Sequence, residues 1–234
     1  IYANENGGSW PIPAFDESLM GKIDYRVPVG GGAGNAHSPN RSQPSFSGPE
    51  GTRELSVSRA YWMMVLSGNI TVKQFICPTS GDVEDPTRNL DQYYDFSDYK
   101  NLSYGFQVPY GRPDTRAQEG ADNKLIFAAD KGPFRDASAS PPLGIMSVSS
   151  ADAPSDGHKA WRPHNSLNHQ SEGQNALFAD GHAAFTRIPI AGVDEDNIYT
   201  IALDSFNESS RTAGESPWLR SSPPLSSTDS VIFP

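Results

Sequence analysis

Apolar positions recur with helical spacing in one internal segment, residues 53–67. The apolar residues of this segment fall roughly on one face of a helix: Leu55, Ala60, Tyr61, Met64 and Val65. Gly68 follows where the pattern ends, as expected at a helix C-terminus. The pattern therefore predicts one internal helix over residues 53–67.

Other apolar runs are shorter and favour strands. Residues 70–76, 101–108, 125–129 and 176–179 each form such a run. The last two have almost the same form, because one is followed by Asp130 and the other by Asp180. Short runs of this kind suit strands that are buried on both faces or nearly so. We expect these two to be neighbouring core strands that deliver both aspartates to the same edge of a sheet.

A β-hairpin is predicted where Asp180 and Gly181 separate two apolar runs. A two-residue turn of the primed type needs positive φ at both positions, which this dipeptide tolerates. The return strand is expected over residues 182–188. His182 then lies in the turn, beside Asp180.

Glycine and proline are abundant, with 21 and 20 residues in a chain of 234. Both interrupt helices, so this composition favours short strands, few helices and long connections. The segments 27–52, 132–160 and 209–230 are especially rich in such residues and predict loops, the last merging into an extended C-terminal tail over 209–234.

The net charge of −10 excludes one class of partner. Lysine and arginine are scattered, whereas binding to a nucleic-acid backbone needs clustered cations. We therefore expect no nucleic-acid partner. No stretch of 18 apolar residues occurs either, so none of the sequence at hand predicts a membrane-spanning helix.

The chain contains one cysteine, Cys77, which excludes an intrachain disulfide and any multi-cysteine metal site. It ends the apolar segment 75–77 and precedes Pro78. No histidine or cation is near it in sequence to activate a thiolate. We therefore predict that Cys77 is a small buried side chain.

Histidine and aspartate gather around the predicted hairpin: His164, His169, Asp180 and His182. These residues suit three kinds of site. Imidazole and carboxylate groups bind divalent metals, and a His–Asp pair can serve in acid–base catalysis. The third interpretation is that His169 and Asp180 make hydrogen bonds that lock the loop onto the hairpin. The sequence favours the third, since it shows no recognisable nucleophile motif and no zinc-protease spacing.

The hairpin region resembles a known family. Asn168 and His169, followed by residues 172–182 (EGQNALFADGH), resemble the C-terminal signature of prepilin-type proteins that are abundant in planctomycetes and their relatives. That signature is a histidine, about nine residues, and then Asp-Gly, and here ten residues intervene. Residues 1–6 and 75–78 resemble the end of the pilin helix and a strand within the head. The signature residues are His169, Asn175, Asp180, Gly181 and His182.

This resemblance implies a single pilin-like head over residues 1–234 with an α+β fold. The sheet would be mostly antiparallel, with long loops, and residues 1–6 would be the stub of the N-terminal helix. The implied protein is extracytoplasmic, at the cell surface or in the periplasm. The missing helix would anchor it in the inner membrane, and its partners would be other pilin-like subunits.

The function implied is structural and not enzymatic: a subunit or minor component of a filament resembling a type IV pilus or a type II secretion pseudopilus. Two alternatives remain open. One is a secreted ligand- or glycan-binding module that uses exposed aromatic rings such as Trp62, Trp161 and Trp218. The other is a metal-dependent hydrolase that uses His169, Asp180 and His182.

Some pseudopilins to which the chain is similar carry a structural calcium ion in a C-terminal loop. The corresponding candidates here are Asp194, Asp196 and Asn197. The segment is not an EF-hand, because Tyr199 replaces the required glycine and Ser205 the bidentate glutamate. The alternative is an exposed acidic turn.

Overall fold

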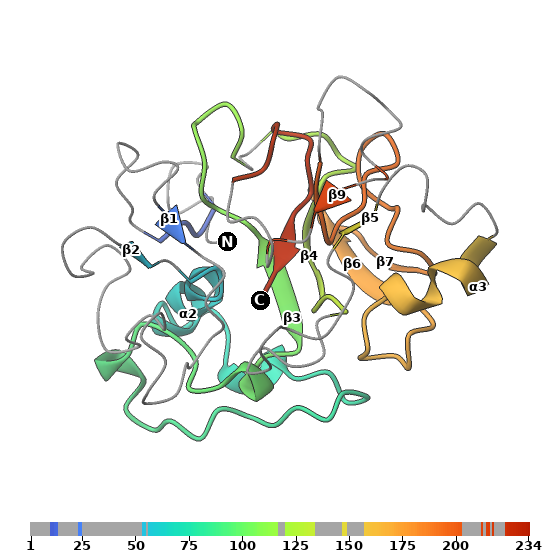
Figure 1. Cartoon of the computed structure of the whole chain (residues 1–234). Coiled ribbons are helices and arrows are strands. Elements are labelled where there is room, and N and C mark those ends of the chain that lie inside the picture. The colour runs from blue at the N-terminus through green and yellow to red at the C-terminus, as the bar shows by residue number, and fades with distance from the viewer. Residues whose placement is uncertain are drawn as a thin grey trace.

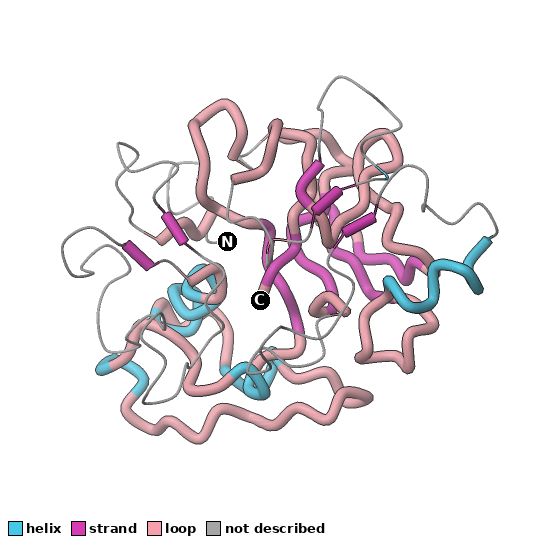
Figure 2. Tube along the Cα trace, viewed as in Figure 1, coloured by secondary structure: helices cyan, strands magenta, loops and turns pink. Residues whose placement is uncertain are grey.

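The computed structural model describes residues 10–13, 23–24, 53–54, 56–116, 120–133, 147–148, 157–202, 212, 214–215, 217 and 223–234. The expected helix stub at residues 1–6 lies outside this part of the chain. Loops connect most of the described elements, as the glycine and proline content predicts (Figure 2). None of the described helices is long and apolar enough to cross a membrane.

The centre of the fold is a five-stranded antiparallel sheet (Figure 1). Its strands, in spatial order, are β10 (Ile232–Phe233), β3 (Tyr104–Gln107), β4 (Ile126–Asp130), β6 (Gln174–Phe178) and β7 (Ala183–Thr186). This sheet confirms the predicted mostly antiparallel architecture, and the strands predicted within 101–108, 125–129 and 176–179 are present. A smaller antiparallel sheet joins β5 (Ser147–Val148), β9 (Gly214–Glu215) and β8 (Ile201–Ala202), and β1 (Ile23–Asp24) pairs in parallel with β2 (Arg53–Glu54).

The pairing of β4 with β6 corrects the expected position of the two aspartates. The strands are neighbours, as predicted, but they run antiparallel, with Ile126 opposite Phe178 and Ala129 opposite Ala176. Asp130 at the end of β4 therefore lies near the start of β6, whereas Asp180 lies beyond its end. The two strands also differ in burial, since β4 is buried along most of its length and β6 alternates.

Helices are few and short. The predicted helix over 53–67 is confirmed only as α2 (Arg59–Leu66), because residues 53–54 belong to β2. The other described helices are α3 (Gly157–Trp161) and the 3₁₀ turns η2 (Val72–Phe75), η3 (Leu90–Gln92), η4 (Tyr99–Asn101) and η5 (Arg162–His164).

The strand predicted over residues 70–76 is wrong, since the centre of this segment is the 3₁₀ turn η2. A capping box explains the difference. The backbone N–H of Thr71 donates to Oε1 of Gln74 at 2.8 Å, which satisfies a donor at the start of the turn. The apolar residues Val72 and Phe75, three positions apart, are then both buried.

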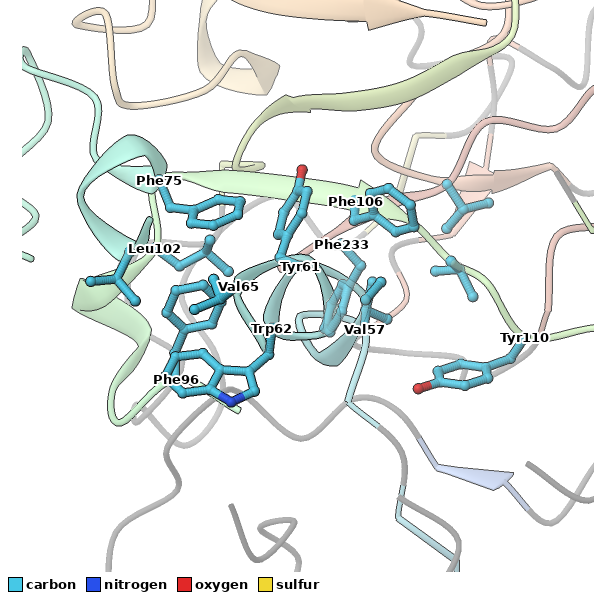
Figure 3. Packing of buried hydrophobic residues seen from close by; sticks show 14 of the residues in the cluster. Val57, Tyr61, Trp62, Val65, Phe75, Phe96, Leu102, Phe106, Tyr110 and Phe233 are labelled. Atoms are coloured by element: carbon cyan, nitrogen blue, oxygen red, sulfur yellow. The ribbon is translucent and has the colours of Figure 1, made fainter. Parts of the chain in front are cut away.

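The main core lies between α2 and the β3 side of the sheet (Figure 3). Aromatic rings meet there edge to face: the centroids of Trp62 and Phe96 are 5.0 Å apart, and those of Tyr61 and Phe106 are 5.1 Å apart. The buried hydroxyl of Tyr61 donates to the carbonyl of Gly105 at 2.7 Å. This bond avoids the penalty of an unpaired buried polar group and fixes the helix over the sheet.

The end of the chain belongs to this core. Val231, Ile232 and Phe233 are all fully buried, and β10 pairs with β3. The side chain of Gln107 accepts a hydrogen bond from the backbone of Val231 at 2.7 Å and donates one to the carbonyl of Asp229 at 2.8 Å. The expectation of an extended tail over 209–234 is therefore wrong for its last residues.

We predict that Phe233→Ala lowers the free energy of unfolding by about 3–5 kcal/mol, because it leaves a cavity in a fully buried aromatic cluster. Val83→Ala is the control, since Val83 is 59% exposed and should change stability by less than about 0.5 kcal/mol. Urea denaturation monitored by tryptophan fluorescence measures both. Equal effects would contradict the placement of the C-terminus in the core.

Candidate functional site

The candidate site is built around the carboxylate of Asp130, the last residue of β4, which is fully buried. Its Oδ1 accepts a hydrogen bond from Nδ2 of Asn168 at 2.9 Å. Its Oδ2 accepts one from the backbone N–H of Asn175 at 2.6 Å, and lies 3.1 Å from Nε2 of His169. Burial of an unpaired carboxylate is strongly unfavourable, so these donors are what allow Asp130 to stand inside the protein.

The loop before β6 is held against the sheet by the same donors. Nδ2 of Asn168 also donates to the carbonyl of Ser103 at 2.6 Å, which ties the loop to the strand region of β3. Within the loop, Gln170 and Ser171 have φ of 57° and 63°, values that cost non-glycine residues free energy. The network around Asp130 offsets this strain.

Gly173 allows the loop to approach β7 closely. Its φ is +155°, and an added Cβ would lie 2.2 Å from the carbonyl oxygen of Thr186 and 2.7 Å from the ring of Phe185. No side chain fits in that space. The glycine of the signature run is therefore needed for packing of the loop onto the hairpin.

His169 belongs to the loop, and its ring lies beside the residues that follow η2. Its Nε2 lies 2.8 Å from Nδ2 of Asn175 and 3.8 Å from Sγ of Cys77. Its Nδ1 lies 3.2 Å from Oγ1 of Thr79. Both ring nitrogens therefore have polar neighbours, Thr79 at Nδ1 and Asn175 together with Asp130 at Nε2.

Cys77 is 3% exposed, which confirms the prediction of a buried side chain. Its Sγ also lies 3.2 Å from Oγ1 of Thr79. Together, Sγ of Cys77, a carboxylate oxygen of Asp130 and a ring nitrogen of His169 lie within 4.8 Å of one another. Within the described residues, this is the one group of three or more His, Cys, Asp or Glu side chains with such spacing.

The second half of the signature forms the hairpin turn. The N–H of Gly181 donates to the carbonyl of Phe178, and the N–H of Phe178 donates to the carbonyl of His182, both at 2.9 Å. Gly181 has φ of +87°, but Asp180 is not among the residues with positive φ. The loop therefore has three residues and ends in a left-handed glycine, and the predicted two-residue primed turn is wrong.

Asp180 and His182 interact with each other at this tip. Oδ1 of Asp180 accepts hydrogen bonds from the backbone N–H of His182 at 3.0 Å and from its Nδ1 at 2.5 Å. Both hydrogen bonds lower the pKa of Asp180, and the bond from the backbone N–H of His182 has the larger effect. The ring of His182 stacks on Phe178 with centroids 4.1 Å apart. Asp180 and His182 are both exposed. His182 also lines an open groove of about 420 Å³ together with Lys124 and Ile190.

The structure thus divides the predicted site residues between two places. His169 and Asn175 meet at Asp130. Asp180, Gly181 and His182 lie beyond the other end of β6. That end is roughly 15 Å away, because each residue of a strand adds about 3.3 Å. The hydrolase hypothesis required His169, Asp180 and His182 to converge, and they do not. The predicted locking role fits His169, but its carboxylate partner is Asp130 and not Asp180.

The candidate calcium ligands differ in their partners and their burial. Oδ2 of Asp196 accepts a hydrogen bond from the backbone of Ser230 at 2.6 Å, and Oδ1 of Asn197 accepts one from Tyr199 at 3.2 Å. Asp194 is exposed and has φ of 53°. Asp196 therefore joins the turn to the residues just before β10, whereas Asn197 makes a local bond within its own segment. The exposed acidic turn is limited to Asp194 and its neighbour Glu195.

Two of the tryptophans that suggested a stacking platform are buried, with Trp62 at 0% and Trp161 at 4% exposed. Trp218 lies outside the described residues. His164, the remaining histidine of the hairpin region, packs edge to face on Trp161 at 5.1 Å, and burial lowers its pKa. Neither buried tryptophan offers a face to a ligand.

Comparisons of the chain with protein-family models, with curated proteins and with solved structures found no match.

We predict that Asp130→Ala lowers the free energy of unfolding by about 3–5 kcal/mol, because it leaves buried donors of Asn168 and Asn175 without acceptors. Asp180→Asn is the matched control. Its side chain is exposed, so its unfolding midpoint should stay close to wild type. Thermal and urea unfolding of the two variants compare them, and a smaller loss for Asp130→Ala would refute the central role of that carboxylate.

We predict that Gly173→Ala destabilises the protein by about 2 kcal/mol or more, through the clash with Thr186. Gly81→Ala is its control, because an added Cβ at Gly81 meets nothing within 4 Å. That variant should change the free energy of unfolding by less than about 1 kcal/mol. Similar urea midpoints for both variants would show that the loop does not need its close approach to β7.

Proposed function

We propose that this chain is the extracytoplasmic head of a pilin-like protein and acts as a structural subunit or minor component of a surface filament. The filament would resemble a type IV pilus or a type II secretion pseudopilus. The observation that carries the proposal is the architectural role of the signature residues, which fasten a loop and close a hairpin.

Each signature residue that the sequence singled out serves the fold. His169 and Asn175 join the loop to the buried Asp130, and Asp180, Gly181 and His182 shape the turn. A catalytic signature places its ionisable side chains around one pocket, where they act on the same substrate. Here these side chains are split between the two ends of β6, which favours a structural role over an enzymatic one.

The hairpin offers a surface for contacts with neighbouring subunits. β7 is at the edge of the sheet and, among the described strands, pairs with β6 alone. Phe185 stands opposite Asn175, two residues from Leu177, so Phe185 and Leu177 share one face of the hairpin. They are 49% and 39% exposed. An open strand edge beside exposed apolar side chains is a feature that subunit interfaces cover.

In this proposal the other partners follow from the resemblance to prepilin-type proteins. A hydrophobic helix encoded upstream of Ile1 anchors the precursor in the inner membrane, and a prepilin peptidase removes its leader. The helix then forms the spine of the filament, and the head described here lies outside the cytoplasm. Such a subunit needs no catalytic residues.

The first test is the coding sequence upstream of Ile1, which we expect to specify a basic leader and about 20 consecutive apolar residues. The precursor should be shortened when it is produced together with a prepilin peptidase, as judged by its mass. A precursor without an apolar segment, or one that the peptidase leaves intact, would refute the proposal.

The second test concerns the hairpin surface. We predict that Leu177→Asp combined with Phe185→Asp abolishes recovery of the head in sheared surface filaments, detected with antibodies against residues 1–234. Val83→Asp, at an exposed position elsewhere, should be recovered like wild type. Circular dichroism of the purified heads establishes that both variants fold. Normal recovery of the double variant would rule out this face as the subunit contact.

A further inference from the structure

Three side chains of metal-ligating type converge beside the loop, although they come from distant parts of the sequence. Cys77 follows η2, Asp130 ends β4 and His169 precedes β6. Nε2 of His169 lies 3.1 Å from Oδ2 of Asp130 and 3.8 Å from Sγ of Cys77. All three ligand atoms lie within 4.8 Å of one another.

The arrangement differs from that of a catalytic Cys–His–Asp triad. In a triad the nucleophile and the carboxylate address opposite nitrogens of the imidazole, so that one nitrogen takes the proton of the nucleophile while the carboxylate orients the ring through the other. Here Cys77 and Asp130 both face Nε2 of His169, and Nδ1 faces the hydroxyl of Thr79 at 3.2 Å. In a metal site the ligand atoms converge on one nitrogen of the imidazole, and a hydrogen bond holds the other nitrogen. The sulfur of Cys77, the carboxylate of Asp130 and Nε2 of His169 follow this pattern.

The distances also suit a tetrahedral ion. Bond lengths of about 2.0–2.2 Å to nitrogen and oxygen and about 2.3 Å to sulfur place neighbouring ligand atoms about 3.4–3.6 Å apart. The observed separations of 3.1 and 3.8 Å lie on either side of these values. Small movements of the side chains would therefore be enough to reach bonding geometry.

Burial and access favour a site with one open position. Cys77 and Asp130 are 3% and 0% exposed, whereas the side chain of His169 is 23% exposed. Solvent therefore reaches the group from the histidine side, where a fourth ligand such as water would complete the tetrahedron.

The amide of Asn175 is the group that a metal would displace. Its Nδ2 lies 2.8 Å from Nε2 of His169 and 3.3 Å from Oδ2 of Asp130. Because Asn175 is exposed, this amide can turn towards solvent, while its backbone N–H keeps its bond to Asp130. The loop would then stay attached to the sheet during metal binding.

We propose that Cys77, Asp130 and His169 bind one divalent transition-metal ion, for which Zn²⁺ is the best match. A thiolate, an imidazole and a carboxylate form a mixed set that zinc accepts, whereas calcium and magnesium prefer oxygen ligands alone. Binding converts the thiol of Cys77 to a thiolate and releases its proton to solvent. The ion would join the loop to the sheet whether or not the chain is a filament subunit.

Titration of the metal-free 1–234 chain with Co²⁺ tests the proposal directly. We expect one equivalent to produce the thiolate-to-cobalt charge-transfer absorption and the visible bands of a tetrahedral site, and Zn²⁺ to remove both. Calorimetry with Zn²⁺ should give one site, and Zn²⁺ should raise the melting temperature. Absence of the charge-transfer band in the wild-type chain would overturn the proposal without any variant.

Variants assign the ligands. Cys77→Ser and His169→Gln should weaken Zn²⁺ binding by more than roughly 100-fold, and Thr79→Val by roughly 10- to 100-fold, as for an outer-shell partner. Asn175→Ala is the matched control, because it breaks hydrogen bonds to the same atoms and removes no ligand, so its affinity should equal or exceed that of wild type. His182→Gln, at the other His–Asp pair, should bind Zn²⁺ normally. Equal losses in Cys77→Ser and Asn175→Ala, or full binding by Cys77→Ser, would refute the site.

Discussion

The burial of one carboxylate constrains much of this structure. Asp130 is held inside the protein by donors from the loop and from β6, and its own carbonyl accepts the hydroxyl of Tyr199 at 2.8 Å. The loop and β6 must therefore both be in place before the charge of the carboxylate is compensated. Because a missing donor leaves a charged group poorly solvated, these contacts form together or not at all. The strained loop before β6 persists for this reason.

The sequence predicted the features that depend on neighbouring residues. The hairpin, the antiparallel strands and the burial of Cys77 follow from local patterns that the fold retains. The 3₁₀ turn at 72–75 replaced a predicted strand because a capping interaction between Thr71 and Gln74 outweighed an apolar run. That signal is also local, and the spacing of Thr71 and Gln74 was enough to find it.

The candidate site was less accessible to sequence reasoning. His169 is 39 residues from Asp130 and 92 from Cys77, so no spacing rule joins them. The similar form of the runs before Asp130 and Asp180 hinted that both aspartates matter, but the direction of strand pairing decides which one meets His169. A role in fastening the loop and a role in metal binding are compatible here. The hydrogen bonds of Asp130 with Asn168 and with the backbone of Asn175 hold the loop without an ion, and both would remain when an ion binds.

The last strand has a consequence for the biogenesis of the protein. β10 is formed by residues 232–233 and pairs with β3, whose residues are made more than a hundred positions earlier. The aromatic core remains incomplete until residues 232–233 have been synthesised and have paired with β3, and pairing at such separation slows folding. A chain truncated before residue 232 lacks this strand, so its aromatic core lacks the ring of Phe233. The native core can therefore form only after the whole segment between β3 and β10 has been synthesised, so that a single short strand decides when the aromatic cluster closes.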